Sequence, residues 1–287
     1  MPKQLKTWGF VAFLGALFVA AYFAVGALAG QTGLIGASTW GSSWFPFMTE
    51  HSFLVQLLYF VIVGHITITA MSLSFHRQHT HQAVKINILV DSFMQAWLWA
   101  FTSMSKLDWV SVHIYHHAHS DQEKDPHSPI QNGFLRALAL GVVDYSRAKA
   151  HPEVLKIRAK LPENRLEHFF GTHLMTGPTL LTFANMLLFG PAWGATLSVM
   201  NFMVSPVFAV GGVNALAHWF GYKNYKTTDN SRNLGFLLPL NWIICGELDH
   251  NNHHRYPRSA SFSHRWYEFD IGYIYLRAMK AIGLARL

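Results

Sequence analysis

The segment from Phe169 to Tyr222 contains no Asp, Glu, Lys or Arg. A water-soluble fold rarely leaves so much chain without charge. About half of the 287 residues are hydrophobic and only 13% are charged, which is typical of a membrane protein. Four apolar windows are long enough to cross the hydrocarbon core of a bilayer, about 30 Å thick, as helices. They are residues 8–29, 53–73, 171–189 and 196–220.

The 22 Lys and Arg residues predict how these windows are oriented. They lie only in the N-terminal tail and in segments 76–168 and 221–287, and the two intervening loops, 30–52 and 190–195, hold none. With the N-terminus in the cytoplasm, this is the distribution of the positive-inside rule. The net charge of +7 therefore indicates membrane orientation and contact with lipids, not nucleic acid binding.

These patterns predict the architecture. The first window resembles a secretory signal, but it is longer than the usual signal core, and we interpret it as an uncleaved span. We expect an all-α membrane protein in which residues 1–287 form a single domain. Four transmembrane helices form two hairpins, and segments 76–168 and 221–287 form a cytoplasmic helical cap.

Ten of the 18 histidines lie in four clusters, namely "HRQHTH" at 76–81, "HIYHH" at 113–117, "NALAH" at 214–218 and "HNNHH" at 250–254. Two clusters contain H-x-x-H-H, and positions i, i+3 and i+4 share one face of a helix. Asn214 and His218 are likewise four residues apart. His76 and His81 are five apart, about 140° around an α-helix. We expect that they cannot converge on one ion along a straight face, and that they reach two neighbouring ions from a helix end.

Whether the clusters meet depends on the apolar stretch 86–104, which Asp91 interrupts. If this stretch crosses the membrane, the first two clusters face opposite sides; if it dips in or lies along the interface, all four meet on the cytoplasmic face. The second arrangement brings together more ligands than the four of one zinc site, so two metal ions fit the count, and the residues do not choose the metal. The converging residues are His76, His81, His113, His116, His117, His218, His250, His253, His254 and Asn214.

Together with "DPHSP", "AHWFGY", "ELDHNNHH" and "WYEFDIGY", the four clusters resemble the membrane fatty acyl desaturases of the stearoyl-CoA desaturase type, bacterial members included. The resemblance runs from about His76 to Ile274. It implies a non-heme di-iron centre bound by the nine histidines, with Asn214 reaching iron through a water. It also implies a reaction in which O2 and two electrons remove two hydrogens from a saturated acyl chain and leave a cis double bond, at the delta-9 position.

The resemblance also implies partners and a location. The substrate is a fatty acyl chain linked to CoA, acyl carrier protein or phospholipid, and electrons come from a separate ferredoxin, rubredoxin or small heme protein. The location is a bacterial inner membrane, with the histidine clusters on the cytoplasmic side. Trp109 matches a residue of the substrate tunnel. The animal acyl-CoA enzymes carry Arg-Asp where this chain has Ser111 and Val112, and Thr-Trp in the tunnel where it has Val210 and Gly211.

Other polar residues near the clusters have weaker patterns. Asp121, Asp125 and His127 are candidates to hydrogen-bond the ligand imidazoles and fix their tautomers. Glu247 forms E-x-x-H with His250, but the soluble ferritin-like di-iron motif needs two such pairs plus two more glutamates, so we interpret this match as chance.

The residues leave two other classes of function open. A fatty acid hydroxylase or a 1-alkene-forming decarboxylase would use the same scaffold. A metal transporter or a membrane cytochrome is the alternative from another class, but transporters usually place their ligands near the middle of the membrane. Membrane cytochromes typically pair histidines within spans, where only His65 and His173 lie.

Overall fold

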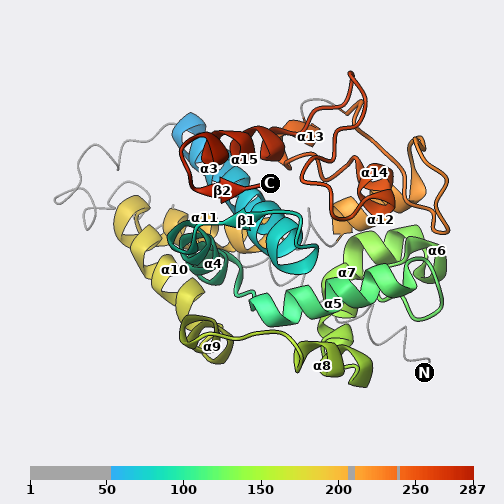
Figure 1. Cartoon of the computed structure of the whole chain (residues 1–287). Coiled ribbons are helices and arrows are strands. Elements are labelled where there is room, and N and C mark those ends of the chain that lie inside the picture. Colours follow the sequence, from blue (N-terminus) through green and yellow to red (C-terminus); the bar gives the residue numbers. More distant parts are fainter. Residues whose placement is uncertain (1–52, 206–210, 238–239) are drawn as a thin grey trace. The chain divides into compact units, whose positions relative to one another are not determined.

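The computed structural model describes residues 53–205, 211–237 and 240–287, and this part is mostly helical, in agreement with the expected class (Figure 1). The two described strands pair antiparallel. The elements are α3 (Phe53–Ala70), the π-helix η2 (Met71–Thr80), β1 (Lys85–Ile86), α4 (Ile88–Thr102), α5 (Lys106–His119), α6 (Pro129–Asn132), α7 (Phe134–Ala148), α8 (Pro152–Arg158), α9 (Arg165–Thr172), α10 (Thr176–Phe189), α11 (Pro191–Ser205), α12 (Asn214–Trp219), α13 (Leu240–Ile243), α14 (His250–Arg255), α15 (Ile271–Ala281) and β2 (Ala285–Arg286).

The chain divides into two compact units. The smaller comprises Met1–Gln56 and Thr182–Ser198, and the larger comprises Leu57–Leu181 and Val199–Leu287. In the smaller unit, the end of α10 and the start of α11 approach closely at Gly194, where a Cβ would collide with the backbone of Asn185. All four histidine clusters belong to the larger unit.

The membrane spans are only partly represented among the described residues. There, one continuous helix is long and apolar enough to cross a membrane: Leu58–Thr80, in which α3 runs into η2. The predicted span 171–189 is interrupted, because α9 ends at Thr172 and α10 begins at Thr176. The window 8–29 and residues 206–210 of the fourth window lie outside the described residues. The four-span arrangement stays a prediction.

Side-chain caps fix where the helices around the histidines begin. Asn87 accepts a hydrogen bond from the N–H of Leu89 at the start of α4, and Ser105 accepts one from the N–H of Asp108 at the start of α5. Such caps satisfy backbone donors that have no partner in the first helical turn. The cap on α5 sets the register of the helix that carries the second histidine cluster.

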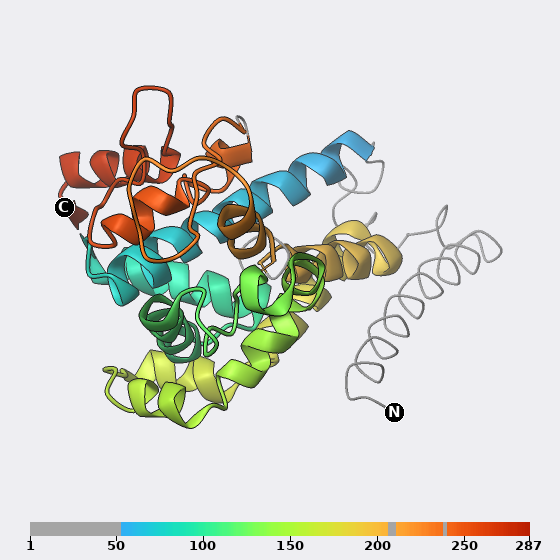
Figure 2. The same cartoon turned by 90° about the vertical axis from the view of Figure 1, so that its right-hand side faces the viewer.

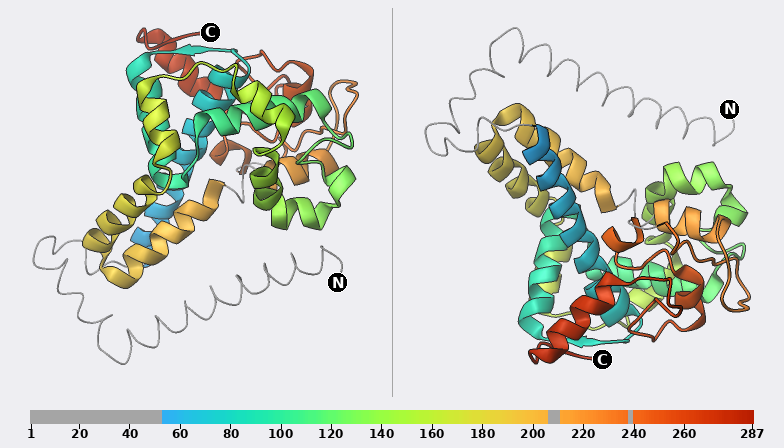
Figure 3. Two further views of the ribbon diagram at one scale, coloured as in Figure 1. Left: turned by 90° about the horizontal axis from the view of Figure 1, so that it is seen from below. Right: turned by 90° about the horizontal axis from the view of Figure 1, so that it is seen from above.

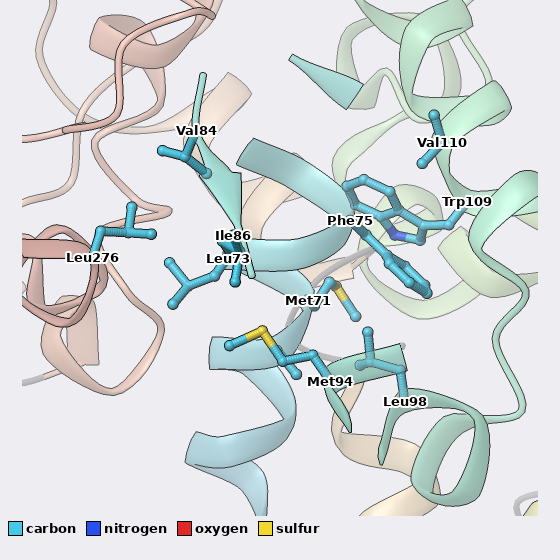
Figure 4. Close-up of a cluster of buried hydrophobic side chains, with 11 residues drawn as sticks. Met71, Leu73, Phe75, Val84, Ile86, Met94, Leu98, Trp109, Val110 and Leu276 are labelled. Atoms are coloured by element: carbon cyan, nitrogen blue, oxygen red, sulfur yellow. The ribbon is translucent and has the colours of Figure 1, made fainter. Parts of the chain in front are cut away.

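The largest hydrophobic cluster holds η2 in place. It combines buried side chains of η2, α4, α5 and α15 (Figure 4), including Leu73, Phe75, Leu98, Val110 and Leu276. In Figure 2, α14 and α15 lie above η2 and α4 lies below it. Figure 3 shows β1 and β2 side by side near the C-terminus.

A buried arginine joins η2 to the C-terminal segment. The guanidinium of Arg77 is fully buried and donates to the carboxylate of Asp270 at 3.0 Å and to the carbonyl of Cys245 at 2.8 Å. It also lies 3.9 Å from the ring centroid of Phe262. A buried cation costs free energy unless it is paired and hydrogen-bonded, so these partners fix the packing of η2 against the C-terminal segment that contains the fourth histidine cluster.

Candidate metal centre

In the first histidine pair, His76 lies on the π-helix η2 and His81 is the C-cap residue of that helix, in which backbone hydrogen bonds join residues five apart. The N–H of His81 donates to the carbonyl of His76 at 3.2 Å, and their ring centroids are 5.0 Å apart. Five-residue spacing therefore places both imidazoles on one side. The expectation that the pair cannot converge on one ion along a straight face is wrong, because it assumed α-helical winding.

The two H-x-x-H-H motifs lie on α5 and α14, as their spacing predicts. In each motif the first and last histidines are four residues apart and their Nε2 atoms approach to 3.1 Å, in the pairs His113–His117 and His250–His254. Asn214 and His218 lie on α12, the third helix that carries candidate ligands.

The nine histidines form two groups, in each of which the ligand nitrogens of all residues lie within 4.8 Å of one another. The five-histidine group consists of His76, His81, His113, His117 and His253, and the four-histidine group consists of His116, His218, His250 and His254. Each H-x-x-H-H motif contributes to both groups. The packing of η2, α5, α12 and α14 thus converts four separate sequence clusters into two adjacent sites.

The donor atoms fit a cation in each group. In the five-histidine group the Nε2 of His253 lies 3.0 Å from the Nε2 of His76 and 3.0 Å from that of His117. Two nitrogens that bind one ion at about 2.1 Å and at right angles are about 3.0 Å apart. In the four-histidine group, the buried Nε2 atoms of His116 and His218 have no hydrogen-bond partner among the described residues.

Carboxylates next to these imidazoles leave Nε2 available as the donor. Asp125 lies 2.8 Å from Nδ1 of His116, and Asp121 lies 2.9 Å from Nδ1 of His218. A carboxylate that accepts the Nδ1 proton fixes the tautomer in which the Nε2 lone pair is free, which is the common arrangement around metal-bound histidine. Two of the three predicted outer residues thus lie at hydrogen-bonding distance from ligand histidines, and the ring of His127 lies against that of His116 with centroids 5.7 Å apart. The third, His127, donates its backbone N–H to Asp125 at 2.9 Å.

Two further carboxylates act in the same way, and the sequence interpretation missed them. Glu247 lies 2.9 Å from Nδ1 of His76 and also accepts from Ser72. Asp229 lies 2.7 Å from Nδ1 of His254. The E-x-x-H motif pairs Glu247 with His250, whereas the residue that it contacts, His76, lies 171 positions earlier in the chain. Asp229 lies in a loop without any motif, so only the fold reveals it.

The electrostatics of the site favour neutral imidazoles. Burial, together with the neighbouring histidines, lowers the pKa of His81 to about 2 and holds the pKa of His113 and His253 well below the ordinary value. Burial also lowers the pKa of His254, to about 4. Burial acts on His116 as well, but nearby carboxylates, Asp125 foremost, outweigh it and raise that pKa. Metal binding requires neutral histidine, so most of these residues are ready to bind at neutral pH.

These shifts predict how the metal-free protein responds to acid. Below about pH 6.5 the unfolded chain takes up protons on the histidines whose pKa the fold lowers, among them His81, His113 and His253, and the folded chain does not. As the pH falls, each such histidine lowers the free energy of unfolding by about 1.4 kcal/mol per pH unit until its pKa in the folded state is reached. We expect the melting temperature of metal-free protein in detergent to change little between pH 8 and 7 and to fall steeply between pH 6.5 and 4.5. A flat profile through that lower window would contradict the buried, neutral state.

Replacing the two missed carboxylates tests their role. We expect Asp229→Asn and Glu247→Gln each to weaken metal binding about 10- to 100-fold, since outer partners of metal-bound histidine have effects of this size. The measurement is metal content after dialysis against graded chelator. The exposed Glu163→Gln removes the same kind of charge away from the histidine groups and should leave the titration unchanged. Wild-type metal retention in both test variants would remove the assigned role.

A cavity adjoins both histidine groups. Its histidine wall is formed by His76 and His113 of the five-histidine group and His250 of the four-histidine group. Its apolar wall includes Ile68, Met71, Val112, Val213 and Ile244. An apolar molecule in this cavity would lie directly against the side chains that can hold metal.

The predicted tunnel residues have different outcomes. Trp109 lines this cavity, and its ring stacks on His113 with centroids 4.6 Å apart. Asn214 is buried and also lines the cavity. Gly211 is buried, and Val210 lies outside the described residues.

Comparison with known proteins gives the family. A family profile described as "Fatty acid desaturase" matches residues 51–279. The chain is 30% identical to Delta-9 acyl-lipid desaturase 1 of Arabidopsis thaliana, over 80% of this chain and 73% of that protein. It is 28% identical to the sn-1 stearoyl-lipid 9-desaturase of Anabaena variabilis, over 80% of this chain and 81% of that protein.

The match covers all four histidine clusters and the elements that carry them. This chain therefore belongs to the fatty acid desaturase family and is an oxidoreductase that acts on fatty acyl chains.

Proposed function

We propose that this protein is an O2-dependent desaturase that introduces a cis double bond into a saturated acyl chain at a di-iron centre. The five-histidine group would hold one iron and the four-histidine group the other, with Asn214 positioned at a water. Bound iron would supply the oxidation of an unactivated methylene pair, using O2 and two electrons. The observation that supports this most strongly is the cavity, which offers an apolar wall opposite histidines of both groups.

The residues around the cavity suit this chemistry. The apolar wall binds a methylene chain and keeps water away from it, at about 0.8 kcal/mol per buried methylene before ordering costs. Trp109 packs against His113 and forms part of the same wall, so one side chain both orients a ligand and positions the substrate. The carboxylates Glu247 and Asp229 hold Nδ1–H protons and keep the Nε2 lone pairs of their histidines directed inward.

For the substrate we propose a lipid-linked saturated chain and the delta-9 position. The named relatives are described as delta-9 acyl-lipid and sn-1 stearoyl-lipid desaturases. Where the animal acyl-CoA enzymes carry an Arg-Asp pair, this chain has Ser111 and Val112, both buried. Val112 forms part of the apolar wall, which is an unsuitable neighbour for the charged groups of coenzyme A.

Expression in a host that lacks monounsaturated fatty acids tests the reaction. We expect mass spectrometry of the host lipids to show loss of two hydrogens at the delta-9 position of phospholipid-linked chains. Gain of oxygen would indicate the hydroxylase and loss of CO2 the decarboxylase; either product without desaturation would contradict the proposal. The inactive control is the same host with the His113→Ala variant.

We further propose that the centre faces the cytoplasm of a multi-pass membrane protein and that an acidic electron carrier, such as a ferredoxin, a rubredoxin or a small heme protein, docks on segment 221–287. In the described part of this segment, every exposed charged side chain is Lys or Arg, whereas the carboxylate side chains are buried or half-buried. Arg255 is exposed directly after His254, a half-buried member of the four-histidine group. Complementary charge accelerates such encounters.

Charge reversal on this surface is expected to slow the donor reaction. Lys226→Glu combined with Arg258→Glu should lower kcat/KM for an acidic donor about tenfold at low salt, and 0.5 M NaCl should remove most of the difference by screening. The matched control is Lys160→Glu, an exposed lysine outside this segment. Equal kcat/KM values for the double variant and wild type at low salt would move the docking site elsewhere.

A further inference from the structure

One histidine in the cavity has no assigned partner. His127 is 6% exposed, and its Nδ1 has no hydrogen-bond partner among the described residues. A buried polar atom without a partner is costly, and in natural proteins such an atom usually marks a site completed by a ligand or water. The ring of Tyr145 stacks on His127 with centroids 6.3 Å apart, and both residues line the cavity.

The other polar side chains of the cavity lining outside the two histidine groups have roles already: Asn214 is assigned to a water at the proposed metal centre. Ser72 and Glu247 also line the cavity, but they bond each other, and Glu247 holds His76. Burial raises the pKa of Tyr145, so its hydroxyl remains protonated and can donate. A saturated acyl chain carries its polar atoms only at the carboxyl-derived end, where the carbonyl oxygen accepts hydrogen bonds.

The apolar lining comes from separate hydrophobic clusters. Ile68, Val213 and Ile244 belong to one cluster, and Val112 packs beside Tyr145 in another. Ile68 lies on the helix that is long enough to cross the membrane. The cavity thus has an apolar part formed by one cluster and a part, beside the other cluster, that contains Tyr145.

We propose that His127 and Tyr145 form the subsite for the carbonyl of the acyl ester and thereby set the register of the chain against the two histidine groups. The chain would run from this subsite past the histidines, with its methyl end toward Ile68 and Ile244. The inference rests on the proposed function, because it assigns the cavity to the acyl substrate. It makes His127 and Tyr145 positioning residues that select which methylene pair faces the metal.

Ligand binding tests the subsite without turnover. The probes are a saturated fatty acid methyl ester and an alkane of the same length, each competing with a fluorescent acyl probe on the purified full-length protein. We expect wild type to bind the ester about threefold to tenfold more tightly than the alkane. Tyr145→Phe and His127→Phe should each lose most of this preference and keep the affinity for alkane. Tyr115→Phe removes a buried hydroxyl outside the cavity lining and should keep the preference.

The position of the double bond gives a second readout. If the carbonyl anchor sets the register, Tyr145→Phe should produce double bonds at several neighbouring positions where wild type produces one. A wild-type ester preference in both variants, or a single unchanged product position in both, would overturn the subsite. A wild type that forms no unsaturated product would instead contradict the proposed function, so the two failures are distinguishable.

Discussion

Replacing His116 by alanine is expected to remove one of two irons and to lower desaturation more than about 100-fold, beyond the range for outer partners of metal ligands. His116 is one of the four histidines of its group and is fully buried, so its loss removes a quarter of the histidine donors at that site. The five-histidine group keeps all its members in this variant. The iron content, measured by inductively coupled plasma mass spectrometry, should therefore fall from about two to about one per chain.

His119 provides the matched control for this experiment. It lies on the same helix, α5, is partly exposed and faces Glu153 at 3.8 Å instead of the histidine groups. His119→Ala should keep both irons and wild-type turnover. Equal effects of the two substitutions would indicate general damage to α5, and full activity of His116→Ala would remove the four-histidine group from the centre.

Moving one histidine by a single position is expected to destroy the five-histidine group. The double substitution Thr80→His, His81→Ala gives a spacing of four from His76, which would align on an α-helix but does not align on the π-helix η2. In wild type the His81 N–H bonds the carbonyl of His76, five positions earlier. We therefore expect the double variant to lose as much iron as His81→Ala alone, with about one iron per chain retained.

Recovery of two irons and activity in the double variant would contradict this expectation. It would show that residues 76–81 wind as an α-helix when metal binds. Melting temperatures of both variants, compared at neutral pH without metal, separate loss of a ligand from loss of the fold.

The sequence predicted those parts of the centre that depend on local periodicity. The pairs His113–His117 and His250–His254 are aligned by α-helical winding alone, and both were placed correctly on helices. The π-helix was not predictable in this way, because the winding of η2 accompanies tertiary contacts. Arg77, between the two histidines of η2, bonds backbone and side chains more than 160 positions later in the chain.

The remaining parts depend on contacts between distant segments. Asp229 lies in a loop 25 positions before its partner His254, and Glu247 lies 171 positions after its partner His76. Pairs of residues that are distant in the chain leave no helical repeat in the sequence, so they could not be predicted from it. The cavity is a similar case, since residues of α3, α5, α7 and α12 form its walls together. Composition and charge predicted four spans, but only one described helix meets the length and hydropathy of a span.

We propose that each histidine group holds one iron in the active enzyme. The most direct test is the iron-to-chain ratio of purified protein whose desaturation has been measured on the same sample, with the oxidation states followed by Mössbauer spectroscopy. We expect about two irons per active chain in two unequal environments, one with five histidine donors and one with four. Full turnover by protein that contains one iron or none per chain would contradict it.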